Sequence, residues 1–206
     1  MFTAAWSASA EQRAEPEAPR PPPIRAHHLN YGVGIGIESM ADPGDACPSG
    51  STAPCIIGSG LGLTVRLGYR TRGDWYVGGA YESSRQGSSN LLRLGTLQQL
   101  RAETRYYASR AYRLQPFAAG AVGVAAYGNE WAVDTVGPIA AIGAGIDFEM
   151  SRTSIVGAGI SYRPIAFRGW TDGAGVRRSD AFFGFGLSHM IGLEFRLELR
   201  SPLARL

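Results

Sequence analysis

The sequence predicts an all-β protein, an eight-stranded antiparallel up-and-down transmembrane β-barrel. Three observations lead to this prediction. Eight segments alternate apolar residues with small or polar ones at a period of two, which is the side-chain period of a strand. The connections between these segments alternate between long and short, and most charged residues of the segments share a row with glycine rather than with the apolar side chains.

The longest alternation occupies residues 181–200, well beyond the five or six residues of an ordinary strand. Its apolar row consists of Phe183, Phe185, Leu187, Ile191, Leu193, Phe195, Leu197 and Leu199. Its opposite row consists of Gly184, Gly186, Ser188, Gly192, Glu194, Arg196 and Glu198. We expect this segment to close the barrel by pairing antiparallel with residues 30–40, which leaves no exposed strand edge.

The remaining strands are predicted from the same alternation. In order, the eight predicted strands are 30–40, 60–70, 75–83, 94–108, 114–127, 138–150, 154–166 and 181–200. Strands of this length suffice to cross a bilayer when tilted, whereas no stretch approaches the ~18 apolar residues of a membrane helix. The long connections are 41–58, 84–93, 128–137 and 167–180, and the short ones are 71–74, 109–113 and 151–153. Outer-membrane barrels have this pattern, with long outer loops and tight periplasmic turns.

The charged residues indicate which row faces inward. An eight-stranded barrel has an interior just wide enough for side chains, so glycines make room there and opposite charges pair. The net charge is only +3, and the arginines are spread along the chain near acids, which disfavours nucleic-acid binding. The predicted lumen charge network is Glu38, Arg66, Glu82, Arg101, Glu103, Arg105, Asp147, Glu149, Arg163, Glu194 and Arg196.

Aromatic residues near the predicted strand ends suggest two girdles at the membrane interfaces. The periplasmic girdle would contain Tyr31, Tyr69, Trp75, Tyr106 and Phe195, and the outer girdle Tyr81, Tyr127, Tyr162 and Phe183.

Three stretches resemble a known family. Residues 115–123 (QPFAAGAVG) are similar to the Pro-aromatic-small-glycine strand of small outer-membrane barrels. Residues 143–162 resemble their Gly-x-Gly-aliphatic-acid-aromatic strand and the turn after it, and residues 192–197 (GLEFRL) resemble their C-terminal insertion signal. Over residues ~29 to 200 the chain thus resembles the outer-membrane β-barrel domains of OmpA-like and OmpX-like proteins. The resemblance implies a bacterial outer-membrane location with both termini in the periplasm. The chain continues to Leu206 after the insertion signal, and we expect no periplasmic domain behind the barrel, so the resemblance does not imply peptidoglycan anchoring.

The flanking segments lie outside this domain. Residues 1–28 are expected to form a disordered signal remnant and a Pro-rich linker, residues 29–200 the barrel, and residues 201–206 a short tail. The Ala8-Ser9-Ala10 sequence has the form of a signal-peptidase site, although a merely disordered terminus explains it equally well. In the first long loop, we expect Cys47 and Cys55 to form a local disulfide rather than two free thiols, which implies an oxidising compartment.

The candidates for chemistry are few, and we expect no enzyme, no metal and no cofactor. His189 is the one histidine outside the linker, and the adjacent Ser188 lies on the other strand face, so the two do not form a hydrolase pair. His189 itself falls on the apolar row, either as a base at the lipid surface or as a neutral interfacial residue.

The expected function is that of a monomeric structural or surface-interaction protein with a lumen filled by side chains. Its expected partners are outer-membrane lipids, lipopolysaccharide and the outer-membrane insertion machinery. Basic and aromatic loop residues could contact lipopolysaccharide phosphates: Arg85, Arg93, Trp131, Arg168, Trp170, Arg177 and Arg178. The alternatives are a lipid A-modifying enzyme, a narrow solute pore and a soluble periplasmic barrel.

Overall fold

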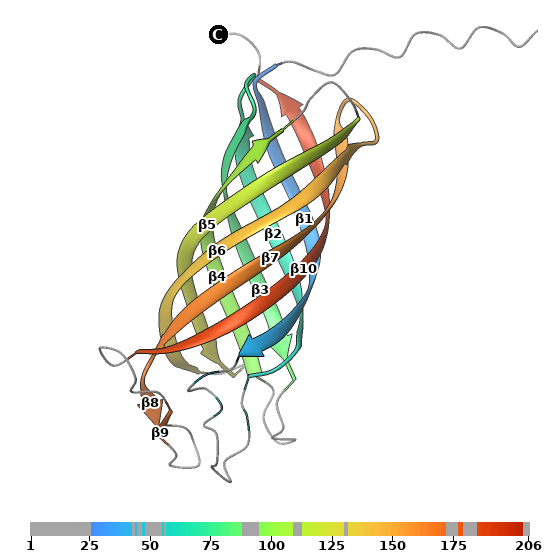
Figure 1. Cartoon of the computed structure of the whole chain (residues 1–206). Coiled ribbons are helices and arrows are strands. Elements are labelled where there is room, and N and C mark those ends of the chain that lie inside the picture. The colour runs from blue at the N-terminus through green and yellow to red at the C-terminus, as the bar shows by residue number, and fades with distance from the viewer. Residues whose placement is uncertain are drawn as a thin grey trace, which may run out of the picture.

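A computed structural model describes residues 26–42, 44, 47, 55, 57–87, 95–108, 113–129, 132–171, 177–178 and 185–203. Eight antiparallel strands close into a barrel in the order β1-β10-β7-β6-β5-β4-β3-β2 (Figure 1). These strands are β1 (His28–Asp42), β2 (Gly60–Arg70), β3 (Trp75–Gln86), β4 (Gly95–Tyr107), β5 (Leu114–Gly128), β6 (Val133–Glu149), β7 (Ser154–Arg168) and β10 (Phe185–Pro202). A two-stranded ribbon, β8 (Trp170–Thr171) and β9 (Arg177–Arg178), lies between β7 and β10 in the chain.

The predicted closure of the barrel is confirmed. β10 pairs antiparallel with β1, and the register places Arg200 opposite Asn30 and Gly192 opposite Glu38. β1 also pairs with β2, so neither strand has a free edge. β1 begins and β10 ends at the same end of the barrel, which we call the turn end, and the β8–β9 ribbon lies at the other, which we call the loop end (Figure 1).

One predicted connection is wrong. β6 begins at Val133 rather than at residue 138, so only residues 129–132 link β5 to β6, and 128–137 is not a long loop. Gly137 and Pro138 pair with Ala125 and Val124 of β5 as strand residues. The β-branched residues Val133, Thr135 and Val136 favour this extension.

The outer surface of the barrel is apolar. Large aliphatic side chains are more than half exposed along most strands, including Ile35 (54%), Leu63 (66%), Leu100 (58%), Ile142 (67%) and Ile160 (57%). A soluble barrel would bury such a row, because exposed apolar patches of this extent are rare on soluble monomers. Membrane barrels, in contrast, expose an apolar outer surface of this kind to the lipid of the bilayer. No helix among the described residues is long and apolar enough to cross a membrane.

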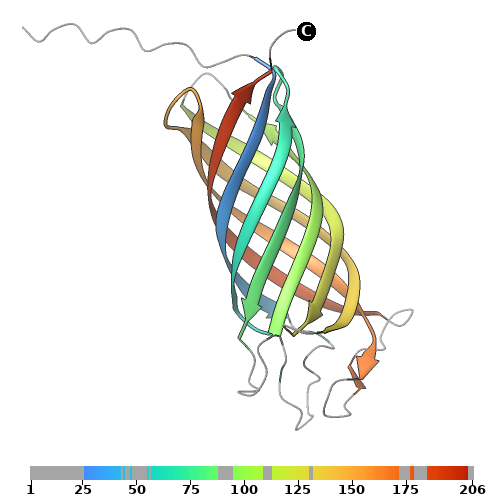
Figure 2. The ribbon, with the colours of Figure 1, turned by 180° about the vertical axis from the view of Figure 1, so that it is seen from behind.

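The wall formed by β5, β6 and β7 differs from the opposite wall, which is formed by β1 to β4. The wall of β1 to β4 faces the viewer in Figure 2. The strands β5, β6 and β7 carry small residues on both faces, such as Ala118, Ala144 and Ala158 outside and Gly143 and Gly157 inside. The β6–β7 ladder is also interrupted. Pairs are formed at Ile139–Ile165 and again at Ile142–Tyr162, but not at Pro164, which has no amide hydrogen to donate.

The interior changes character at the loop end. There an apolar plug of buried side chains fills the mouth, and it consists of Ile57, Leu97, Ala125, Tyr127, Ile139, Ile165, Phe167 and Met190. Tyr127 is fully buried and its ring packs against Phe167 and Trp170, so its placement in an outer aromatic girdle is wrong. The other girdle residues are exposed on the outside, except Phe183, which lies outside the described residues.

Candidate functional site in the charged interior

The predicted lumen residues all lie on the inward face of the barrel. Glu38, Arg66, Glu82, Arg101, Arg105, Asp147, Arg163, Glu194 and Arg196 are buried, and the Glu103 and Glu149 side chains are only slightly more exposed. The structure adds three buried charges that the prediction omitted, Arg70, Glu198 and Arg200. Among the residues that the structure describes, the interior therefore holds seven carboxylates and seven arginines. The carboxylates are Glu38, Glu82, Glu103, Asp147, Glu149, Glu194 and Glu198, and the arginines are Arg66, Arg70, Arg101, Arg105, Arg163, Arg196 and Arg200.

The layer nearest the loop end is organised by Arg163. Its Nη1 atom lies 2.9 Å from Glu38 Oε1 and 2.9 Å from Glu82 Oε2. Arg101 approaches the same Glu82 oxygen through Nη2 at 2.5 Å. Because β1, β3, β4 and β7 each supply one member, these ion pairs cross the lumen and tie distant parts of the wall together.

Neutral groups complete the hydrogen bonds of Glu38. Ser84 Oγ and Gln86 Nε2 donate to Oε2 at 2.5 and 2.7 Å, and Gln99 Nε2 donates to Oε1 at 2.7 Å. A buried carboxylate is costly unless it is both paired and hydrogen-bonded. Glu38 meets both conditions.

The central layer is organised by Glu198. Arg105 Nη1 lies 2.8 Å from Glu198 Oε1, and Arg105 Nη2 lies 2.9 Å from Glu103. Arg66 contacts Glu194 directly and approaches Glu103 and Glu198 at 3.6 and 3.8 Å. All of these charges except Glu194 thus have more than one partner of opposite sign.

Asp147 joins this layer to the aromatic residues of the lumen. It pairs with Arg196 and accepts a hydrogen bond of 2.8 Å from the Tyr107 hydroxyl. The Arg196 guanidinium also lies 4.5 Å above the Phe117 ring centre, and the Arg70 guanidinium lies 3.7 Å above that of Tyr107. Cation–π contacts of this kind are strongest where the cation is desolvated.

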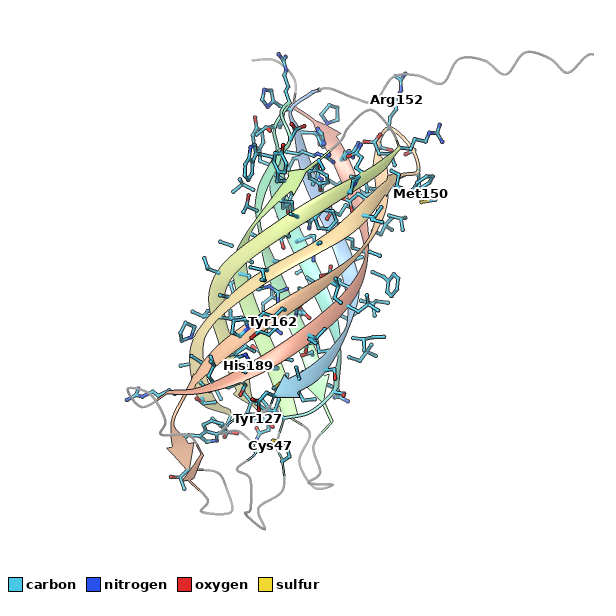
Figure 3. The ribbon with its side chains drawn as sticks, in the orientation of Figure 1. Cys47, Tyr127, Met150, Arg152, Tyr162 and His189 are labelled. Atoms are coloured by element: carbon cyan, nitrogen blue, oxygen red, sulfur yellow. A yellow bond between two sulfur atoms is a disulfide. The ribbon has the colours of Figure 1, made fainter. Side chains whose placement is uncertain are left out.

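The layer at the turn end is a chain of contacts. Arg70 donates to Gln115, whose amide donates to Glu149 Oε1 at 2.8 Å, and Arg200 Nη1 lies 2.5 Å from the same oxygen. Glu149 directly precedes the tight turn between β6 and β7, whose residues Met150 and Arg152 are labelled in Figure 3.

Two glycines show why the inward row contains so many of them. A Cβ atom at Gly157 would overlap Asp147 and Arg196, and one at Gly68 would overlap the buried Tyr76 ring. Glycine at these positions leaves the room that the long charged and aromatic side chains occupy.

A cavity of about 70 Å³ lies inside the barrel. Arg66, Arg105 and Arg196 line one side, and the small-residue wall of β5, β6 and β7, including Ala119 and Gly159, lines the other. This space suits a few water molecules. Among the described residues no group of histidines, cysteines and acids is arranged to hold a metal ion.

The remaining predicted residues lie away from this network. Cys47 and Cys55 form a disulfide, and their Cα atoms are 4.6 Å apart. The Cys55 sulfur lies 2.8 Å from the carbonyl oxygen of Ile57, whose side chain enters the apolar plug. Cys47 and Tyr127 are close to the same mouth in Figure 3.

Ser188 and His189 lie on opposite faces of β10, Ser188 buried and His189 partly exposed. They therefore share no surface on which a nucleophile and a base could meet. Instead, His189 stacks on Tyr162, with ring centres 5.8 Å apart.

The loop residues expected to contact lipopolysaccharide are only partly described. Arg85 and Arg168 are exposed, whereas Trp170 packs against the apolar plug. β9 contains Arg177 and Arg178, and Arg93 and Trp131 lie outside the described residues.

A signal for the missed charges was present in the sequence. Glu198 and Arg200 continue the inward row of Glu194 and Arg196 at the same period of two, and Arg70 continues the row of Arg66. The predicted strands reached all three residues, and Glu198 was already assigned to the inward row, but the predicted charge network left them out. The neutral donors were missed for other reasons. Ser84 and Gln86 lay in the predicted loop 84–93, whereas β3 extends to Gln86. Gln99 lay in a predicted strand, but polar residues without charge are common on strands of any kind.

Comparison with known proteins supports the fold. No protein-family model and no curated protein matches the chain. Neisserial surface protein A is similar in structure, with a TM-score of 0.58 and 11% identity over 84% of this chain and 96% of that one. The outer-membrane protein OprG of Pseudomonas aeruginosa gives a TM-score of 0.51 and 12% identity over 88% and 99%. The outer-membrane protein AlkL gives a TM-score of 0.50 and 13% identity over 100% and 99%. The chain thus has the fold of small eight-stranded outer-membrane barrels.

Proposed function

We propose that this chain is a monomeric outer-membrane barrel with a closed lumen, and that it acts in the cell envelope as a structural or surface-interaction protein through its loop end. The observation that carries the proposal is the filled interior. Among the described residues, six arginines pair with seven carboxylates across the lumen, and the apolar plug covers them at the loop end. Little space is left for a solute to pass.

The proposed orientation places the turn end and both termini in the periplasm. It is supported by the connections, because those at the turn end, residues 71–74, 108–113 and 150–153, are short. Two connections at the opposite end are much longer, residues 43–59 and 169–184. Outer-membrane barrels have long loops outside. The disulfide in the first of these long loops is consistent with an oxidising compartment.

We further propose that the protein has no enzymatic activity. The lumen carboxylates are engaged by arginines, which is the usual arrangement of a structural ion-pair network rather than of an acid–base pair. The proposed partners are the insertion machinery and the lipids of the outer membrane, including lipopolysaccharide.

Membrane fractionation tests the proposed location. After a urea wash the chain should remain with the membranes, and it should migrate differently on gels before and after heating, as folded barrels do. Release into the soluble fraction would contradict the proposal and favour a soluble periplasmic barrel.

Two further measurements test the proposed role. In planar bilayers the purified chain should give no steady conductance, whereas defined conductance steps would identify it as a narrow pore. Lipid A mass spectra of cells with and without the gene should be identical, and a change in acylation would identify an enzyme.

A further inference from the structure

The lipid-facing surface of the barrel has a hollow over β6, β7 and β10. It has a volume of about 440 Å³ and is lined by Ile142, Gly143, Ala144, Ile160, Ser161, Tyr162 and Ile191. This volume falls within the ~300 to 1,000 Å³ of small-ligand sites, and the lining is almost entirely apolar. The hollow exists because Ala144, the outward residue of β6 between Ile142 and Ile146, has a small side chain. The neighbouring strand β7 also carries a small residue close to it, Ala158.

A polar pair lies at the rim of this hollow, on its loop-end side. The Tyr162 hydroxyl and His189 Nδ1 are 2.5 Å apart, and the two rings are nearly parallel, at 14°. Figure 3 shows both side chains together on the outer face of the barrel. When the Tyr162 hydroxyl donates to Nδ1, the His189 proton is on Nε2, which then has a donor to offer to a further acceptor.

We infer that this hollow is a binding site for one acyl chain of lipid A, with the Tyr162–His189 pair hydrogen-bonded to the ester or amide carbonyl where the chain joins the headgroup. The inference rests on the proposed function, because that orientation places the loop end in the outer leaflet. An outer-leaflet chain descends from the loop end toward the centre of the bilayer. It would therefore meet the polar pair first and the apolar hollow next, in the order in which the barrel presents them.

The charge beyond the rim favours lipid A, whose phosphate groups carry a net negative charge, over a lipid without net charge such as phosphatidylethanolamine. Arg168 lies on the same outward row of β7 as Tyr162, farther toward the loop end, and is exposed. Phosphate groups are bound by arginine through charge-assisted hydrogen bonds. Toward the loop end, the barrel surface thus presents first an apolar hollow, then a hydrogen-bond donor for a carbonyl group, and then a cation that can bind a phosphate group. The inference also explains why a histidine stands on an otherwise apolar row.

Native mass spectrometry of the full-length folded chain tests this site. The chain in detergent is incubated with lipid A or with phosphatidylethanolamine, and the bound lipids are counted. We expect one retained lipid A and little retained phosphatidylethanolamine. Ala144→Leu fills the hollow from the outward face and should lower lipid A occupancy by about fivefold or more, since it removes the volume that the chain occupies.

Two variants make the test specific. His189→Leu keeps the apolar volume but removes the donor, and should lower occupancy by about fivefold, the factor that one hydrogen bond of ~1 kcal/mol contributes. Ala102→Leu changes an exposed outward alanine on β4, two strands away from β6, and should bind lipid A as the unmodified chain does.

The possible outcomes separate the inference from the function on which it rests. Equal retention of both lipids, or full retention by Ala144→Leu, in a chain that fractionates with membranes would overturn the acyl-chain site alone. Release of the unmodified chain from membranes would overturn the proposed function and this inference together.

Discussion

Replacement of Arg163 by methionine probes the ion pairs that fill the barrel. In the folded chain this arginine is 3% exposed and is the shared cation of Glu38 and Glu82, both of them buried. Methionine has a comparable length but no charge, so the variant leaves the volume nearly filled while removing one positive charge from the lumen. We expect the free energy of unfolding to fall by about 3 kcal/mol.

The magnitude follows from what each carboxylate retains. Loss of one partner from a buried ion pair costs about 3 to 5 kcal/mol, because the other charge is left uncompensated. Here Glu82 still has Arg101 at 2.5 Å, and Glu38 still accepts hydrogen bonds from Ser84 and two glutamines. The cost should therefore lie at the lower end of this range.

The assay is reversible urea unfolding of the barrel in lipid vesicles, followed by tryptophan fluorescence. Arg152→Met is the matched control, because Arg152 is exposed in the turn between β6 and β7, and such surface changes stay within about 0.5 kcal/mol. The double variant Arg163→Met/Glu38→Gln should be more stable than the sum of the two single losses predicts, because the partners are coupled.

Two results would refute this reasoning. A loss no larger than that of the Arg152 control would mean that Arg163 is solvated and that the lumen is open to water. Strict additivity in the double variant would mean that Arg163 and Glu38 do not interact across the lumen.

Three other substitutions test separate parts of the structure. Leu193→Arg places a charge on the outer face in mid-barrel and should cost about 2 to 4 kcal/mol in vesicles, whereas Leu203→Arg, beyond the end of β10, should cost little. Cys47→Ser removes the disulfide across a separation of eight residues and should lower stability by about 2 to 3 kcal/mol under oxidising conditions, measured with and without a thiol reductant. Tyr127→Ala empties part of the apolar plug and should cost about 3 to 5 kcal/mol, clearly more than Tyr106→Ala on the outer surface.

Each of these expectations has a contrary result. Equal losses for the two leucine variants would mean that the apolar row does not face lipid. An effect of Cys47→Ser that persists after reduction of both proteins would assign it to packing rather than to the disulfide. Equal losses for the two tyrosine variants would place both rings in the same environment.

The sequence alone was sufficient to predict which residues face the lumen on each strand. The reason is local, since successive side chains of a strand point to opposite faces. Once one residue of a strand is assigned to the lumen or to the outer surface, the face of every other residue of that strand follows. Tyr127 illustrates the strength of this rule. Its position places it on the inward row with Ala125, and the prediction failed only where the general preference of aromatic residues for the interface was given more weight.

Strand ends were harder to predict, for a related reason. Pro138 and Gly137 are turn formers in isolation, yet in β6 they pair with β5, because the cross-strand ladder and the lipid-facing row extend past them. Arg70 and Arg200 are the last residues of their predicted strands, and the predicted lumen network left them out although both are buried.

Which charges pair with one another was decided by the tertiary structure. Arg66 contacts Glu194, 128 residues away, and Arg163 contacts Glu38, 125 residues away, because the closure and stagger of the barrel bring strands from opposite parts of the chain to one level of the lumen. The same closure places His189 beside Tyr162 and leaves the hollow below them. Alternation along a strand is encoded locally and can be derived from the sequence, whereas contacts across the lumen and between neighbouring strands depend on register and exist only once the barrel has closed.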